Sequence, residues 1–347
     1  MATVRAVPAA PTAPEAERAR QQALRIAVAV AGGMTMMVAA GSITPFLAPL
    51  FAAQFLVASR SPLKGAQAFG MAILIISVGQ GLDLMTSLLG SRPALFTAML
   101  WLLYLGCFFA QATGKGGQAP FLVLVIAIMV PLMNMLHQDL GESISVLFGV
   151  AVGGGALLAW ATHALFPDQG GMAAAPPILP VPVEFALLRS VANASILVAA
   201  VILCLVDSRL SSAIVIPVTV ASILNQLDLA TSRRAAFDLV LVNILGGVVA
   251  SFVFTVLDTR PTLLGLFLAV FVVGLLFGSG AATDPKFGKA YAGALTTFLI
   301  LLGLGISPLP TSTPESFSTR ITYVSAAVLC ALWASLLLWP RTRHQGR

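Results

Sequence analysis

Twelve apolar stretches, most of them close to the length of a membrane-crossing helix, follow one another along this chain with short loops between them. A transmembrane helix needs about 20 mainly apolar residues. Only 9% of the residues are charged, against about 25% in a soluble domain. The pattern predicts an all-α integral membrane protein with about 12 transmembrane helices. The stretches are residues 23–42, 44–59, 66–89, 94–112, 119–136, 144–166, 185–206, 211–227, 235–257, 262–280, 289–306 and 320–340.

The second half of the sequence repeats the first. Arg92-Pro93 recurs 168 residues later as Arg260-Pro261, and Pro49 matches Pro217 at the same offset. Each half contains six apolar stretches, an even number, so both halves enter the membrane from the same side. We therefore expect two parallel six-helix repeats, residues 23–166 and 185–340, related by a pseudo-two-fold axis along the membrane normal.

Charge placement predicts the orientation. Cytoplasmic loops of membrane proteins carry an excess of Lys and Arg. With the N-terminus inside, all but four of the 19 Lys and Arg residues fall on the cytoplasmic side. The four are Arg92, Arg209, Arg260 and Arg320. We expect both termini in the cytoplasm, with residues 1–22 as a disordered tail, 167–184 as a Pro/Ala/Gly-rich linker and 341–347 as a basic tail. The net charge of +6 thus encodes topology and does not indicate nucleic-acid binding.

Motifs of the common enzyme classes are absent from the sequence. It holds no GxxxxGK[ST], HExxH or GxSxG pattern, and its three cysteines form no CxxC. The run Gly153-Gly154-Gly155 lies inside an apolar stretch, which favours close helix packing over phosphate binding. His137, Asp139 and Glu142 share one loop and are expected to be solvated. We therefore expect no enzyme activity, no cofactor and no metal site.

Two carboxylates at or near membrane depth are candidates for proton coupling, because such groups are costly in a bilayer and mark pathways. Asp83 lies in the third stretch with polar Gln80 at i−3 and Ser87 at i+4. The alternative is an interfacial carboxylate near Arg92. Asp238 lies early in the ninth stretch, where an ion pair with a preceding arginine is the alternative.

Other polar residues inside apolar stretches are candidates for lining a pore or for bonding neighbouring helices. The pore-lining candidates are Gln54, Gln80, Asn193 and Asn243, and Asn134 is a further polar residue of this kind. Pro49 and Pro217 occupy matching places in the two short stretches and predict helix kinks.

Basic residues at matching places in the two halves are candidates for an anion site at the cytoplasmic mouth. Arginine binds carboxylates well because its guanidinium donates two parallel hydrogen bonds. Snorkelling of the side chains to lipid headgroups is the alternative. The candidates are Arg25, Arg60 and Lys64 in the first half and Arg189, Arg233 and Arg234 in the second.

Residues 43–81 and 212–251 carry a family resemblance. They read ITPFLAPLFAAQFLVASRSPLKGAQAFGMAILIISVGQG and SAIVIPVTVASILNQLDLATSRRAAFDLVLVNILGGVVAS. Each combines a short proline-containing stretch, a basic turn and a long apolar stretch. The pattern resembles the fusaric-acid-resistance/aromatic-acid-exporter superfamily of bacterial inner-membrane proteins, in a branch that is associated with periplasmic membrane-fusion adaptors. The turns Lys64-Gly65-Ala66 and Arg233-Arg234-Ala235 depart from the Arg-x-x-Gly-Thr of that superfamily.

The resemblance implies an inner-membrane exporter of small organic anions or amphipathic aromatic compounds, coupled to protons and working with a periplasmic adaptor. A passive anion channel and a non-transporting membrane scaffold are the alternatives. The expected partners are the lipid bilayer, a small-molecule substrate and the adaptor, and the sequence leaves homo-oligomers open.

Overall fold

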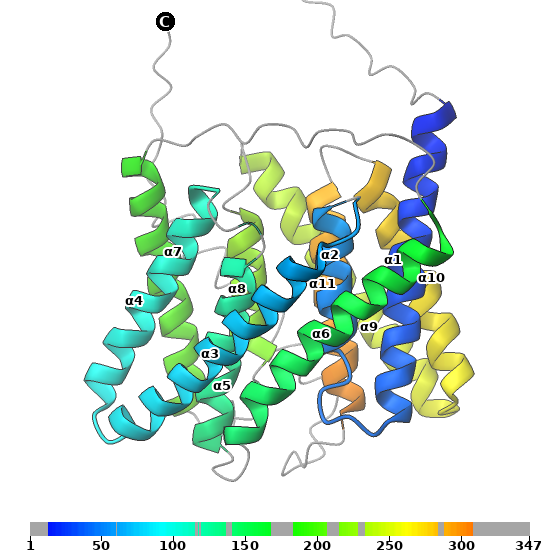
Figure 1. Cartoon of the computed structure of the whole chain (residues 1–347). Coiled ribbons are helices and arrows are strands. Elements are labelled where there is room, and N and C mark those ends of the chain that lie inside the picture. The colour runs from blue at the N-terminus through cyan, green and yellow to red at the C-terminus, as the bar shows by residue number, and fades with distance from the viewer. Residues whose placement is uncertain are drawn as a thin grey trace, which may run out of the picture.

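The computed structural model describes residues 13–59, 61–114, 117, 119–136, 141–167, 183–206, 215–227, 233–283 and 288–307. This part of the chain consists of eleven α-helices and contains no strand (Figure 1). Each helix coincides with one of the apolar stretches, which confirms an all-helical fold, and the stretch 320–340 lies outside the described residues. The helices are α1 (Ala13–Ala39), α2 (Leu47–Ala58), α3 (Gly65–Leu89), α4 (Pro93–Ala112), α5 (Ala119–Leu136), α6 (Gly141–Leu165), α7 (Val183–Val206), α8 (Val215–Leu227), α9 (Arg233–Thr259), α10 (Leu263–Thr283) and α11 (Gly288–Ile306).

Six of these helices are long and apolar enough to cross a membrane, namely α1, α3, α4, α6, α7 and α10. The chain is therefore a multi-pass membrane protein. The sequence also predicted full spans at 44–59 and 211–227, but α2 has 12 residues and α8 has 13. A 12-residue helix is about 18 Å long, against about 30 Å of hydrocarbon. Helices this short do not cross the bilayer alone and are surrounded by longer ones.

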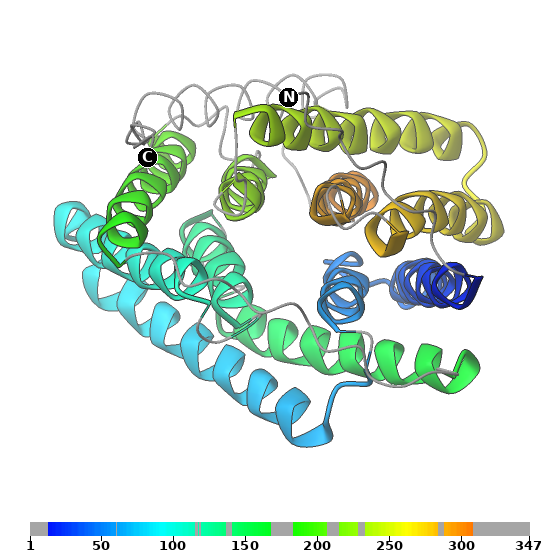
Figure 2. The same cartoon turned by 90° about the horizontal axis from the view of Figure 1, so that it is seen from above.

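The helices form two groups, which we name inner and outer. In the view from above, α2, α5, α8 and α11 lie in the middle, and the other seven described helices surround them (Figure 2). Every residue of α2 is buried except Gln54, Val57 and Ala58, and residues 120–133 of α5 are buried except Val123. A helix that is apolar all round belongs in a protein interior. The four inner helices therefore form the core.

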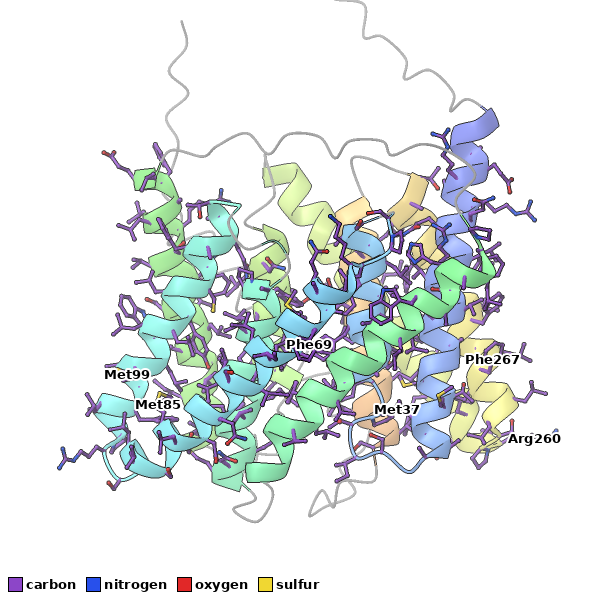
Figure 3. The ribbon with its side chains drawn as sticks, in the orientation of Figure 1. Met37, Phe69, Met85, Met99, Arg260 and Phe267 are labelled. Atoms are coloured by element: carbon purple, nitrogen blue, oxygen red, sulfur yellow. The ribbon has the colours of Figure 1, made fainter. Side chains whose placement is uncertain are left out.

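The outer helices present apolar side chains on the outside of the molecule. Phe69, Met99 and Phe252 are 69%, 44% and 69% exposed. Figure 3 shows such side chains along the flanks of the molecule, among them Met99 on α4 and Phe267 on α10. In water this surface would aggregate. In a bilayer it contacts lipid, which explains why so apolar a chain can fold.

The first helix begins earlier than the sequence predicted. Residues 1–22 were expected to be a disordered tail, yet α1 starts at Ala13. The segment Ala13–Gln22 contains only alanine, proline and charged or polar residues, so its polarity suggested a tail. Its Ala, Glu, Arg and Gln residues are strong helix formers, and Pro14 stands in the first turn, where proline is tolerated. Helix propensity therefore extends α1 beyond the apolar stretch.

Hydrogen bonds between distant segments define the two ends of the bundle. At the end where α1 begins, Gln22 Nε2 donates to the Leu56 carbonyl near the end of α2. Trp160 Nε1, near the end of α6, donates to the Leu63 carbonyl over 2.7 Å. At the opposite end, Ser307 Oγ after α11 donates to the Ile43 carbonyl between α1 and α2. The helices α1 and α3 thus begin at the end of the bundle where α2 and α6 end, and α11 ends at the opposite one.

The glycine run in α6 packs against an inner helix, as the sequence predicted. A Cβ on Gly155 would lie 2.7 Å from Phe51 Cβ and 2.9 Å from the Ala52 backbone nitrogen of α2. A Cβ on Gly153, two residues earlier, would meet nothing within 4 Å. Gly155 is therefore the position at which α6 approaches the backbone of α2.

We expect Gly155→Ala to lower the stability of the protein by about 1–3 kcal/mol, because the methyl group must push α2 and α6 apart. Gly153→Ala is the matched control in the same helix, and should be neutral or stabilising by about 0.5–1 kcal/mol because alanine favours the helix. Thermal unfolding of the purified protein in detergent measures both. Equal melting temperatures for the two variants would contradict the close contact.

Candidate functional site

Arg25 lies deep in the protein near the beginning of α1. Its side chain is 0% exposed. Its Nε donates to the Phe166 carbonyl over 2.7 Å, Nη2 donates to the same oxygen, and Nη1 donates to Gln22 Oε1 over 3.2 Å. Phe166 directly follows α6, and the last carbonyls of a helix lack partners within the helix. The guanidinium therefore caps α6, where its positive charge also opposes the negative end of the helix dipole.

Gln22 completes this contact, one turn before Arg25 on α1. Its amide oxygen accepts from Arg25 and its nitrogen donates to Leu56 near the end of α2. The two side chains together join the ends of α2 and α6 to α1. We name Gln22, Arg25, Leu56 and Phe166 the capping node. These bonds of Arg25 join helix ends, whereas the sequence predicted an anion ligand at this position.

Asp83 of α3 has its partner in α5. Asn134 Nδ2 donates to Asp83 Oδ1 over 2.6 Å, and both residues are half-buried. The Asn134 Oδ1 atom is buried and has no hydrogen-bond partner among the described residues. The carboxylate is therefore stabilised by one amide proton, and the same amide offers an acceptor for a proton on Asp83.

The side chain of Gln80 is more exposed than that of Asp83. Gly79 and Leu82 are buried, whereas Gln80 and Leu84 are exposed, so Asp83 lies at the border between the buried and exposed faces of α3. Gln80 is thus a solvent-accessible residue of α3 and is not packed against α5 with Asp83. Ser87 is also exposed and donates to Leu84 of its own helix.

Gln54 links the two halves of the chain. Its Nε2 on α2 donates to Thr296 Oγ1 on α11 over 2.9 Å. Gln54 is partly exposed, although Ala53 and Phe55 beside it are buried. The sequence predicted Gln54 as a polar residue that lines a pore or bonds a neighbouring helix, and the structure shows a partner in the other half.

The prolines that were predicted to kink helices lie in first turns. Pro49 is the third residue of α2 and Pro217 the third of α8. In the first turn the backbone N–H has no partner within the helix, so a proline there removes no helical hydrogen bond. Pro131 is the described proline that lies inside a helix. It frees the carbonyl of Ala127, four residues earlier, and Tyr104 Oη on α4 donates to that carbonyl over 3.0 Å.

The remaining candidates fall into two groups. Lys64 is exposed just before α3, Arg189 is half-buried on α7, and Asn193 is fully buried on α7. The others have side chains outside the described part of the protein; these are Arg60, Arg233, Arg234, Asp238 and Asn243. Among the described residues no three His, Cys, Asp or Glu side chains are close enough to bind a metal.

Sequence reasoning missed three residues that take part in these contacts. Gln22 was assigned to the tail, although its i,i+3 spacing to Arg25 was a signal. Thr296 stands with Thr297 in an apolar stretch, which marks a polar position in an inner helix. Tyr104 gave no signal, because its bond depends on Pro131 in another helix.

Comparison with known proteins agrees with the resemblance seen in the sequence. A family model described as "Fusaric acid resistance protein-like" matches residues 208–334. This range includes α8 to α11 and the segment 212–251, so the predicted resemblance to this superfamily is confirmed in the second half of the chain. Searches of curated proteins and of solved structures gave no match.

Proposed function

We propose that this membrane protein is an inner-membrane transporter that exports small organic anions or amphipathic aromatic compounds. The observation that carries the proposal is the inner group of helices, to which both halves contribute and in which Gln54 and Thr296 bond across the halves at 2.9 Å. Polar groups are kept inside an apolar core mainly at functional positions. The description of the matched family names resistance to fusaric acid, an aromatic carboxylic acid, which supports this substrate class.

The pairing of helices supports two repeats related by a pseudo-two-fold axis. In the proposed arrangement each helix of the first half corresponds to the one six places later. The contact of α3 with α5 has its counterpart in α9 with α11, and that of α1 with α2 in α7 with α8. Between the halves, α4 packs on α7 as α10 packs on α1, and α5 on α8 as α11 on α2. These pairs support a transport path between two equivalent units.

The pair of Asp83 and Asn134 supports proton coupling. A carboxylate that is half-buried between two helices within a membrane-spanning segment costs free energy unless it is used or paired. Here the pair can exist with the proton absent, as an amide N–H donating to the carboxylate, or present, as a carboxylic acid donating to the amide oxygen. We therefore assign proton binding to Asp83. Export past an outer membrane would use a periplasmic adaptor at the end of the bundle that contains Ile43 and Ser307.

Flux measurements in liposomes test the transport function. Purified protein reconstituted into liposomes should move an aromatic acid in a saturable way, and an imposed proton gradient should drive its accumulation. Steady ionic conductance without a gradient would favour the passive anion channel instead. An absence of both flux and conductance would favour the non-transporting scaffold.

Reporter fusions test the orientation of the chain in the membrane. Fusions after Ala112 and Leu165 should both report the cytoplasm.

A further inference from the structure

The four inner helices are almost free of charge. Within the bounds of α2, α5, α8 and α11, the sequence contains one charged residue, Lys289, which is the second residue of α11. Polar groups are nevertheless present, as the amide of Gln54 and the hydroxyl groups of Thr219, Ser222, Thr296 and Thr297. All four hydroxyl residues are buried, with exposures of 1–2%. The core is therefore polar at a few points and uncharged there.

Two of these groups have capacity for a further hydrogen bond. A glutamine amide can donate twice and accept twice, and the Gln54–Thr296 contact uses one donor. Thr219 Oγ1 on α8 is buried and has no hydrogen-bond partner among the described residues. Buried hydroxyl groups are normally satisfied, because an unpaired one costs about 1–3 kcal/mol. A ligand that binds between these helices would satisfy both.

The proposed repeat relates polar positions of α2 and α8 to one another. Ser222 is the equivalent of Gln54 at the offset of 168 residues that also relates Pro49 to Pro217. It lies three residues after Thr219, on the same side of α8. Contacts of α11 with both α2 and α8 place the two helices next to a common neighbour, as Figure 2 also shows. The polar groups of α2 and α8 thus lie on the two helices that flank α11, which carries Thr296.

An uncharged site discriminates strongly between the two forms of an acid. Moving an ionised carboxylate into an apolar interior without a cationic partner is very costly, whereas the neutral acid needs only hydrogen bonds. A primary amide and a carboxylic acid are complementary, since each has one donor and one acceptor side by side. A carboxylate only accepts, so it would leave the amide oxygen facing another acceptor.

We infer that Gln54, Thr219, Ser222 and Thr296 form a substrate site that takes an aromatic acid in its protonated, uncharged form. This inference rests on the proposed transport function and narrows its substrate class from organic anions to neutral acids and neutral amphipathic aromatics. The proton stays on the substrate carboxyl group throughout binding, so no proton transfer to the protein is needed at this site.

Three probes of similar shape test the inference: benzoic acid, benzamide and benzenesulfonate. Binding to the full-length protein in detergent is measured by calorimetry between about pH 5 and pH 7, where benzoic acid, a carboxylic acid of ordinary pKa, is mostly ionised. We expect the apparent affinity for benzoic acid to fall about tenfold per pH unit, in step with its protonated fraction. The affinity for benzamide should not change with pH, and benzenesulfonate, which is always ionised, should not bind. Benzenesulfonate bound as tightly as benzamide, or benzoic acid bound equally at all pH values, would overturn the inference.

Variants locate the site. Gln54→Leu should weaken benzamide binding about tenfold, the loss expected for hydrogen bonds of a neutral amide. Gln80→Leu is the matched control, since Gln80 is exposed on α3, and it should bind as the wild type does. Thermal unfolding of each variant accompanies the titration, and Thr219→Val replaces Gln54→Leu if the latter does not fold. Equal affinity for benzamide in Gln54→Leu, Thr219→Val and Gln80→Leu would contradict a binding site between the inner helices.

Binding and flux also separate this inference from the proposed function. A protein that binds benzamide with the expected pattern but transports nothing contradicts transport and leaves the site in place. A protein that accumulates benzenesulfonate in liposomes contradicts the neutral-acid site and leaves transport in place.

Discussion

Arg25→Ala is expected to lower the melting temperature of the purified protein by about 5 °C or more and to reduce the yield of monodisperse protein. The substitution leaves the Phe166 carbonyl without the two guanidinium donors that reach it and Gln22 Oε1 without its donor. Hydrogen bonds to charged groups contribute about 1.5–3 kcal/mol each, and a buried acceptor left unpaired costs about 1–3 kcal/mol. A loss of ~3 kcal/mol corresponds to a shift of several degrees in a protein of this size.

Two further arginine variants serve as controls. Arg20→Ala removes an exposed arginine from the same helix, and we expect it to melt as the wild type does. Arg25→Lys keeps the positive charge but loses the planar fork that binds Phe166 twice, so it should fall between wild type and Arg25→Ala. Thermal unfolding and size-exclusion chromatography in detergent measure all three.

The same experiment decides between the two interpretations of Arg25. The sequence suggested an anion ligand, for which Arg25→Ala would keep wild-type stability and lose transport. The capping node predicts the reverse order, in which stability is lost first. An Arg25→Ala protein that melts normally and fails to move an aromatic acid would contradict the structural role and restore the anion site.

The positions of the helices could be predicted from the sequence because lipid imposes a simple rule. Each crossing must be long, apolar and internally hydrogen-bonded, so apolar length alone located α3 and α4 to within a residue. The residues at the start of α1 are helical but polar, so apolar length did not predict that this helix begins at Ala13. The effect of a proline depends on where its helix begins, which the sequence does not show. Pro49 was therefore predicted to kink a helix, although it lies in a first turn.

The candidate site was predicted less well, because its contacts join residues far apart in the chain. Asp83 was predicted to be functional because a carboxylate in a membrane span is energetically costly. The polar residues expected beside it were its neighbours on α3. Its partner in the structure is Asn134, 51 residues away. Gln54 was likewise found without Thr296. A single sequence shows which polar residues enter the membrane, whereas the packing of helices decides which of them meet.

Asp83→Asn is expected to reduce proton-driven accumulation of substrate strongly while leaving substrate exchange across the membrane intact. Asparagine has the shape of aspartate and can still accept a hydrogen bond from Asn134, but it cannot bind and release a proton. Coupling between two ligands of one protein is commonly worth about 5- to 150-fold in affinity, so accumulation should fall by about that factor. Liposomes with an imposed proton gradient measure accumulation, and counterflow of labelled substrate measures exchange.

Asp258→Asn is the matched control for the loss of a carboxylate. Asp258 is exposed near the end of α9, so its substitution should leave both activities unchanged. Asn134→Leu removes the amide but keeps the carboxylate, and should alter the pH dependence of accumulation more than the melting temperature if Asn134 positions the proton. If Asp83→Asn accumulates substrate as the wild type does, the bond of 2.6 Å to Asn134 joins α3 to α5 and has no part in coupling.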